Sequence, residues 1–151
     1  MSELRLRRRI LGIDLGKARI GVAVSDELGM LAHPLETVEA SGDAVRRVAE
    51  LAREKNAERV VVGLPRHMNG AVGASANDAL AFAEKLRAIV SCEVITWDER
   101  LTTTAANRAL RDSGRKVRNS RGVIDQVAAQ MILQGYLDSQ QTAEILPGFE
   151  S

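Results

Sequence analysis

A short run of β-branched residues, Val60-Val61-Val62, constrains the fold of this chain more than any other feature. The run lies between Arg59 and Leu64 and does not alternate between apolar and polar residues. Such a pattern is typical of a strand that is buried on both faces in a parallel region of sheet. Because helices must cover both faces of a parallel region, the run predicts an α/β fold.

Helical patterns lie on both sides of this strand. From Asp43 to Asn56 apolar positions recur at helical spacing, and Ser41 or Asp43 is available as the N-cap. After a polar loop over 66–73, a second helix is indicated by Ala79, Phe82, Ala83, Leu86 and Ile89. Glu93 to Trp97 is then predicted to form another central strand.

The C-terminal third predicts two more helices. Thr102 or Thr103 caps one that runs to about Ser113, where Gly114 provides the C-terminal glycine, and a basic loop follows over 114–122. The last helix is predicted over 123–138 and is apolar on most sides, as expected of a helix packed across a sheet. The tail after Gln140 is expected to be loosely attached.

The N-terminal part predicts antiparallel strands. Arg9 to Leu15 and Ile20 to Ser25 are separated by a short turn that contains Gly16, which indicates a hairpin. A third strand over 31–38 contains Pro34 and is therefore compatible only with a sheet edge or a bulge. The complete order predicts an α/β fold with a mixed sheet of five strands, three antiparallel and two parallel, flanked by helices.

Composition limits the class of protein. The 151 residues suit a single domain over 1–151, with an ordered core expected at about 9–139. The net charge of +1 gives no general attraction to nucleic acid or membrane. Cys92 is the only cysteine, which excludes an internal disulfide and a multi-thiolate zinc site. No segment is typical of a signal peptide or membrane span, so a reducing cytoplasm is the expected compartment.

Asp14 is the first candidate for a functional residue. It lies inside the apolar run from Ile10 to Leu15, where an ionised carboxylate is costly unless it is paired or binds a metal. The structural alternative is that Asp14 simply ends the strand in an Asp-x-Gly turn.

Asp98 and Glu99 follow the second buried strand, at the edge where open α/β sheets bind ligands. The structural alternative is that both acids favour the start of a helix and pair with Arg100 at the surface. Asp125 lies in the first turn of the last helix, on the same face as Ala128, Ala129 and Ile132, which is expected to point toward the sheet. The structural alternative is that an Asp near the start of a helix interacts favourably with the helix dipole and has no other role.

Three separated acidic positions provide the oxygen ligands that Mg²⁺ or Mn²⁺ prefers, and zinc is not indicated. The residues predicted to act in catalysis and in metal binding are Asp14, Asp98, Glu99 and Asp125. Cations near these acids are predicted to contact nucleic acid: Lys17, Arg19, Arg66, Arg100, Arg115, Lys116, Arg118 and Arg121. The few aromatic residues are spread along the chain, so no base-stacking platform is expected.

These residues together resemble a known family. The segments that carry the resemblance are Gly12 to Gly16, Arg19 to Asp26, Val61 to Pro65, Asp98 to Thr103 and Ile124 to Ala129. They are similar, in collinear order from about Ile10 to Leu137, to the pre-16S rRNA nucleases, also described as Holliday-junction resolvases. The segment around Gly16 and the residue Gln126 depart from the usual basic pattern, but every carboxylate of the pattern is present.

The resemblance implies a ribonuclease-H-like fold and a metal-dependent nuclease whose acids match Asp14, Asp98 or Glu99, and Asp125. It implies processing of the 5′ end of pre-16S rRNA, with resolution of Holliday junctions or non-catalytic nucleic-acid binding as alternatives. A sugar-kinase or actin-like protein also begins with an Asp-x-Gly hairpin, but such proteins need two of these domains. Whether the chain acts as a monomer or a homodimer is left open.

Overall fold

The structure, a computed structural model, describes residues 9–65, 74–99 and 121–145. Its strands are β1 (Arg9–Leu15), β2 (Arg19–Ser25), β3 (Ala32–Glu39), β4 (Ala57–Leu64) and β5 (Glu93–Asp98). Its helices are α1 (Ala44–Glu54), α2 (Ala74–Arg87) and α4 (Arg121–Ile145). The five strands form one sheet in the order β3-β2-β1-β4-β5.

The sheet is mixed, as the sequence predicts. β1 pairs antiparallel with β2, and β2 pairs antiparallel with β3. β4 is parallel to both β1 and β5, so the Val60-Val61-Val62 run lies in the parallel half. All three of these valines are fully buried. The predicted arrangement of three antiparallel and two parallel strands is therefore confirmed.

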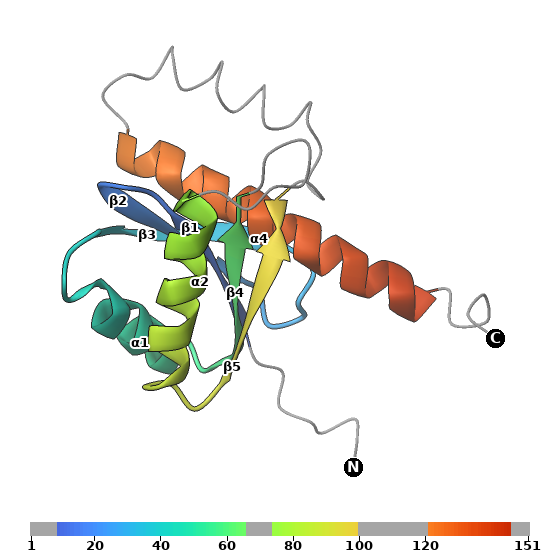
Figure 1. The fold of residues 1–151 in the computed structure, drawn as a ribbon. Helices are drawn as coiled ribbons and strands as arrows, with labels where there is room; N and C mark the ends of the chain where they lie inside the picture. The colour runs from blue at the N-terminus through green and yellow to red at the C-terminus, as the bar shows by residue number, and fades with distance from the viewer. Residues whose placement is uncertain (1–8, 66–73, 100–120, 146–151) are drawn as a thin grey trace.

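Helices cover the two faces of the sheet unequally. α1 and α2 lie on one face, and the long α4 crosses the other face (Figure 1). Side chains alternate along β1, so that Leu11 and Ile13 join the core beneath α1 and α2 while Ile10 joins the core beneath α4. α4 contacts β1, β2 and β3, which are more than eighty positions earlier in the chain.

Glycines on three neighbouring strands let α4 approach the sheet closely. A Cβ atom at Gly12 would lie 2.6 Å from Cβ of Leu133, and one at Gly63 would lie 2.6 Å from Cδ1 of Ile132. A Cβ atom at Gly21 would overlap the carbonyl oxygen of Asp125. A side chain at Gly12 or Gly21 would therefore push the helix away from the sheet, whereas at Gly63 the end of the Ile132 side chain would have to move.

β3 is an edge strand, as Pro34 requires. The β2–β3 register shifts between Val22 and Ala23, and Pro34 pairs with Ala23 just beyond the shift. Pro34 has no backbone N–H to donate, and its place on an edge strand beside the register shift means that the sheet loses little by this.

Two boundaries differ from the predictions. α4 begins at Arg121 and continues to Ile145, because no proline interrupts its C-terminal half and Gln141 Nε2 donates to the backbone oxygen of Met30. Ile89 lies beyond the end of α2 and is 53% exposed, whereas the helical pattern places it on the buried face. The predicted helix over 102–113, the predicted loop over 66–73 and residues 114–120 of the predicted basic loop lie outside the described residues.

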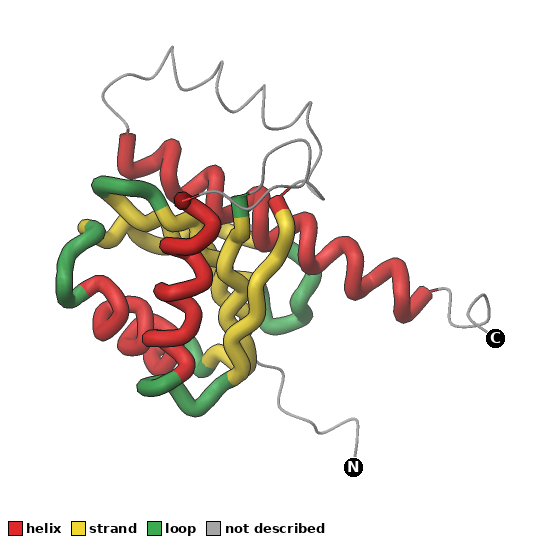
Figure 2. Tube along the Cα trace, in the orientation of Figure 1, coloured by secondary structure: helices red, strands yellow, loops and turns green. Residues whose placement is uncertain are grey.

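The arrowheads of β4 and β5 lie at the same edge of the sheet in Figure 1, and Figure 2 shows the two strands side by side in the same view. β1 is parallel to them, so its carboxyl end points to that edge as well. Within the described ranges, no helix has the length and apolar character needed to cross a membrane.

Candidate active site

Asp14 is near the carboxyl end of β1, on the face that α4 covers. Alternation along β1 puts it on the same side as Ile10 and Gly12, and its register partner on β2 is Gly21. Burial raises the pKa of the Asp14 carboxyl to about 6, and the negative charge of Asp125 contributes to the rise. Among the described residues, no group donates a hydrogen bond to this carboxylate.

Asp125 comes to Asp14 through the packing of α4. Its backbone oxygen lies directly over Gly21, which is opposite Asp14 in the hairpin. The Asp125 side chain is bound by a cation, because Nε of Arg19 donates to its Oδ2 at 2.8 Å. α4 therefore presents a carboxylate at the end of β1, on the sheet-facing side that was predicted from Ala129 and Ile132. Because α4 begins at Arg121, Asp125 lies in its second turn, and the prediction that it lies in the first turn is wrong.

Glu99 follows the last residue of β5 and reaches the same face of the sheet. Its Oε2 lies 3.1 Å from the position that a Cβ atom at Gly63 would occupy, beside Ile132 of α4. The pKa of the Glu99 carboxyl is raised to about 7, first by burial and then by the negative charges of Asp14 and Asp98. Gly63 thus leaves the space in which this carboxylate lies.

Asp98 differs from its neighbour Glu99. It pairs with Leu64 at the end of β5, one residue after Trp97, which packs into the core beneath α4. Because side chains alternate along a strand, Asp98 points to the face covered by α1 and α2. Its charge still contributes to the raised pKa of Glu99.

The donors at this edge are carboxylate oxygens, which fit Mg²⁺ or Mn²⁺ and do not fit a soft metal. In the described parts of the chain, no three His, Cys, Asp or Glu side chains are arranged to hold one metal ion as they stand. The ion pair to Arg19 accounts for part of this, because it directs one oxygen of Asp125 to a cation. Burial raises the pKa values of Asp14 and Glu99, and the negative charges of neighbouring acids add to both shifts.

The predicted nucleic-acid contacts are only partly described. Lys17 is exposed in the turn between β1 and β2, and Arg19 is bound to Asp125. Arg121 is the first residue of α4 rather than part of the preceding loop. Five other predicted cations lie outside the described residues: Arg66, Arg100, Arg115, Lys116 and Arg118.

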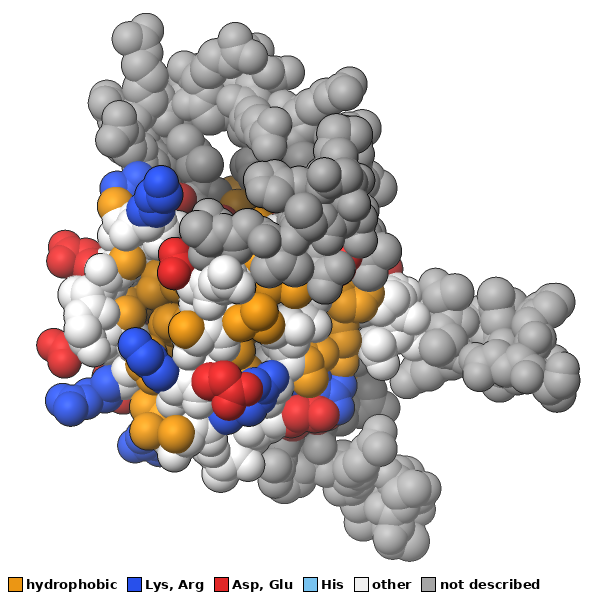
Figure 3. Space-filling view, viewed as in Figure 1, with side chains coloured by type: hydrophobic (Ala, Val, Ile, Leu, Met, Phe, Trp, Pro, Cys, Tyr) orange, Lys and Arg blue, Asp and Glu red, His pale blue; other side chains and the backbone are white. Residues whose placement is uncertain are grey.

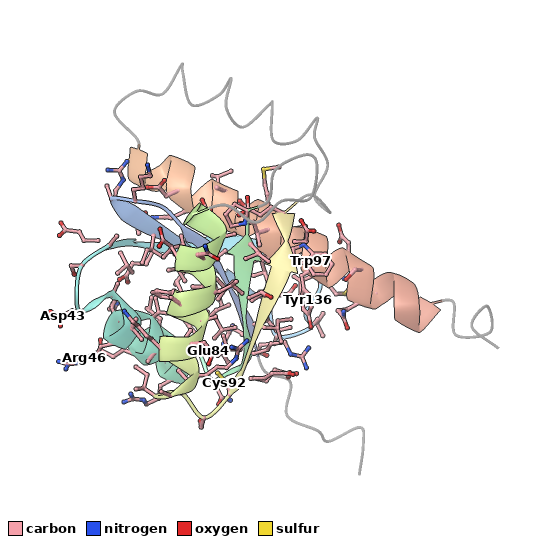
Figure 4. The ribbon with its side chains drawn as sticks, viewed as in Figure 1. Asp43, Arg46, Glu84, Cys92, Trp97 and Tyr136 are labelled. Carbon is pink, nitrogen blue, oxygen red and sulfur yellow. The ribbon has the colours of Figure 1, made fainter. Side chains whose placement is uncertain are left out.

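Sequence reasoning missed two arrangements at this face. Gly21 and Gly63 make room for α4 and for Glu99, and the signal that could have revealed them is a glycine inside a strand pattern. Trp97 and Tyr136 come together from β5 and α4 with ring centroids 5.5 Å apart in an edge-to-face pair (Figure 4). Arg59 donates to the hydroxyl of Tyr136, so this pair supports the core rather than a base-stacking surface.

Comparison with known proteins identifies close relatives. A protein of Acetivibrio thermocellus named "Putative pre-16S rRNA nuclease" is 47% identical over 136 residues, which cover 87% of this chain and 96% of that protein. A protein of Mycobacterium ulcerans with the same name is 52% identical over 139 residues, which cover 90% of this chain and 82% of that protein.

A solved structure shares the fold. T. thermophilus RuvC in complex with Holliday junction substrate matches 89% of this chain and 96% of that chain, with a TM-score of 0.56 and 19% identity. The likeness confirms the predicted ribonuclease-H-like architecture. The model of the RuvX family, described as Holliday junction resolvase, matches residues 8–139. The chain therefore belongs to the RuvX family, as its sequence motifs indicate.

Proposed function

We propose that this protein is a metal-dependent nuclease that hydrolyses phosphodiester bonds at the edge where β1, β5 and α4 meet. The observation that supports it most is the half-buried carboxylate of Asp14, which has no described hydrogen-bond donor and lies within the electrostatic influence of Glu99 and Asp125. A fold gains nothing in stability from such a cluster of acids, so the cluster points to a function that needs them.

Asp14, Glu99 and Asp125 are the residues that would hold Mg²⁺ or Mn²⁺. A divalent ion there would supply an activated water and charge stabilisation for an in-line displacement at phosphorus. Arg19 holds and orients the Asp125 carboxylate, and α4 keeps that carboxylate close to Asp14 through its contact with Gly21. Asp98 acts on Glu99 through its charge, from the other face of the sheet.

We propose the 5′ end of pre-16S rRNA, in the cytoplasm, as the substrate. The names of the relatives support this choice, because they are between 47% and 52% identical to this chain over most of its length. Resolution of Holliday junctions is the second candidate, supported by the description of the family that matches residues 8–139. Both substrates present the same phosphodiester to the same acids.

The test is a cleavage assay with Mg²⁺ or Mn²⁺ on two labelled substrates in parallel, a pre-rRNA 5′ leader and a four-way DNA junction. The expected result is metal-dependent cleavage of the leader that is abolished in Asp14→Asn. Asp43→Asn is the matched control, because Asp43 is exposed, makes no side-chain cap bond and lies at the start of α1, on the other face of the sheet from α4 (Figure 4). If only the junction is cleaved, the Holliday junction becomes the proposed substrate in place of pre-16S rRNA. Activity of Asp14→Asn equal to that of the parent would overturn the nuclease proposal.

A further inference from the structure

A pocket lies on the face of the sheet opposite to α4. It is a cavity of about 510 Å³ between the β1–β2 turn, the segment before α1, and α2, and we name it the α1–α2 pocket. Apolar side chains line part of it, among them Leu15, Ile20, Val45 and Phe82. In the space-filling view hydrophobic side chains are visible on this face, with Lys or Arg side chains nearby (Figure 3). Its volume is in the range of small-molecule sites, about 300 to 1,000 Å³.

The charged residues of the α1–α2 pocket are Lys17, Lys85 and Asp78. Both lysines are exposed, and neither makes an ion pair with another described residue. The lining side chains carry two positive charges and one negative charge, and the exposed Asp43 adds a negative charge between the lining residues Gly42 and Ala44. The positive potential of the pocket is therefore local to Lys17 and Lys85. The start of α1 opens toward the same space, with no side-chain cap from Asp43 and no acid in its first turn. The backbone N–H of Ala44 donates to the oxygen of Ser41, and the positive end of the helix dipole lies at the same place.

The pocket and the proposed active site meet at the end of β1 but lie on opposite faces of the sheet. Leu15 follows Asp14 directly and lines the pocket, and Lys17 lies at its rim three residues after Asp14. Three residues of extended chain span at most about 11 Å. A substrate strand that lies across the acids must therefore pass over the β1–β2 turn to reach the pocket, and the distance it has to span is short.

We propose that the α1–α2 pocket holds one nucleotide of the substrate strand, next to the phosphodiester that is cut. The proposal rests on the proposed nuclease function and adds to it the place where the strand leaves the acids. Lys17 and Lys85 contact the flanking phosphates, and the base and sugar pack against Leu15, Ile20 and Phe82. Asp78 accepts a hydrogen bond from a sugar hydroxyl or a base amino group. An apolar floor with a cationic rim is what a nucleotide unit needs, since it joins a flat apolar base to an anionic phosphate.

The test measures binding without cleavage, by fluorescence anisotropy of a short labelled single-stranded RNA in EDTA. The double variant Lys17→Gln/Lys85→Gln is compared with Arg53→Gln/Lys55→Gln, which removes two cations at the opposite end of α1. The pocket variant is expected to bind more weakly, and its log–log salt slope is expected to flatten by about 0.7 for each phosphate that it no longer neutralises. The control is expected to keep the affinity and salt slope of the parent.

A second variant, Ala81→Leu, fills the pocket without changing charge, because Ala81 is an exposed residue of α2 that lines it. It is expected to weaken binding while leaving the salt slope unchanged, since it displaces base and sugar but no cation. Thermal melts check that all variants fold. Parent-like binding by both pocket variants, or equal weakening by the control, would overturn the proposal.

A third arm separates a substrate strand from a free nucleotide. Nucleoside monophosphates are titrated against the labelled strand, and only weak competition, at millimolar concentrations, is expected. A mononucleotide that binds with the same dependence on Lys85 and does not displace the strand would make the pocket a nucleotide site unconnected with the substrate. The nuclease proposal fails in a different experiment, if metal-dependent cleavage does not need Asp14. The binding measurements contain no metal and therefore test the pocket independently of cleavage.

Discussion

Asp14 places a negative charge where the structure does little to compensate it, and stability should therefore depend on pH. Its folded-state pKa of about 6 exceeds the ordinary value of 3.8, so the folded protein retains a proton that the unfolded chain has released. The free energy of unfolding falls as pH rises through this window and stays lower above it. Asp14→Asn should thus raise the metal-free stability at pH 8, by about 1 to 2 kcal/mol after allowance for solvent screening.

The gain from Asp14→Asn should disappear near pH 4, where the native carboxyl is protonated in the folded state and about half protonated in the unfolded chain. Urea unfolding at pH 4 and pH 8 measures both values, and cleavage should be abolished in the same variant. A loss of stability at pH 8 would mean that the Asp14 carboxylate has a structural role.

Glu99 and Asp98 should separate in function because they face opposite sides of the sheet. Glu99→Gln should abolish cleavage and reduce the rise in melting temperature that Mg²⁺ or Mn²⁺ causes, since its carboxylate lies on the α4 side by Gly63. Asp98→Asn should cost about 10-fold in rate, as expected of a neighbour that acts on a ligand. Metal titrations followed by thermal melts compare the two variants. A larger loss of cleavage and of metal stabilisation in Asp98→Asn than in Glu99→Gln would exchange the roles of the two residues.

At the scale of the elements, the position of α4 controls the site. Gly21→Ala should lower the free energy of unfolding by about 1 to 3 kcal/mol, because the new methyl group meets the backbone of Asp125. Cleavage should fall more than stability alone explains, since Asp125 moves with the helix. Gly42→Ala is the control: its Cβ would have no atom within 4 Å, so its effect on stability should stay within about 0.5 kcal/mol.

The elements are also where the sequence was most informative. Periodicity predicted the sheet, and Pro34 correctly required β3 to lie at an edge, because proline removes a donor wherever it occurs. The predicted end of α4 was wrong, because the helix continues past Asp138 to where Gln141 contacts Met30. That contact joins residues more than a hundred positions apart, which local patterns do not reveal. The ion pair between Arg19 and Asp125 escaped prediction for the same reason. Which of Asp98 and Glu99 joins Asp14 depends on where β5 ends, and residue types cannot fix that boundary.

At the scale of the whole molecule, a net charge of +1 requires that binding of nucleic acid rely on local cations. Replacing Arg115, Lys116, Arg118 and Arg121 by Ser should weaken binding equally for unrelated sequences, because phosphate contacts carry no sequence information. The salt slope should flatten by about 0.7 to 0.9 for each phosphate that is no longer neutralised. Anisotropy titrations at several salt concentrations measure both effects, and an unchanged slope would leave these residues as solvated surface.

The packing of α4 on the first three strands also affects how the protein is made. β1 to β3 are synthesised first and α4 last, yet α4 covers their open face and carries Asp125. A chain still emerging from the ribosome has the hairpin and Asp14 but lacks the helix that completes the carboxylate cluster. Interactions between such distant segments form late, because the long stretch of chain between them must close into a loop first. The carboxylate cluster should consequently be complete only after α4 has been synthesised and has packed on the sheet, so that a partly synthesised chain lacks the proposed nuclease activity.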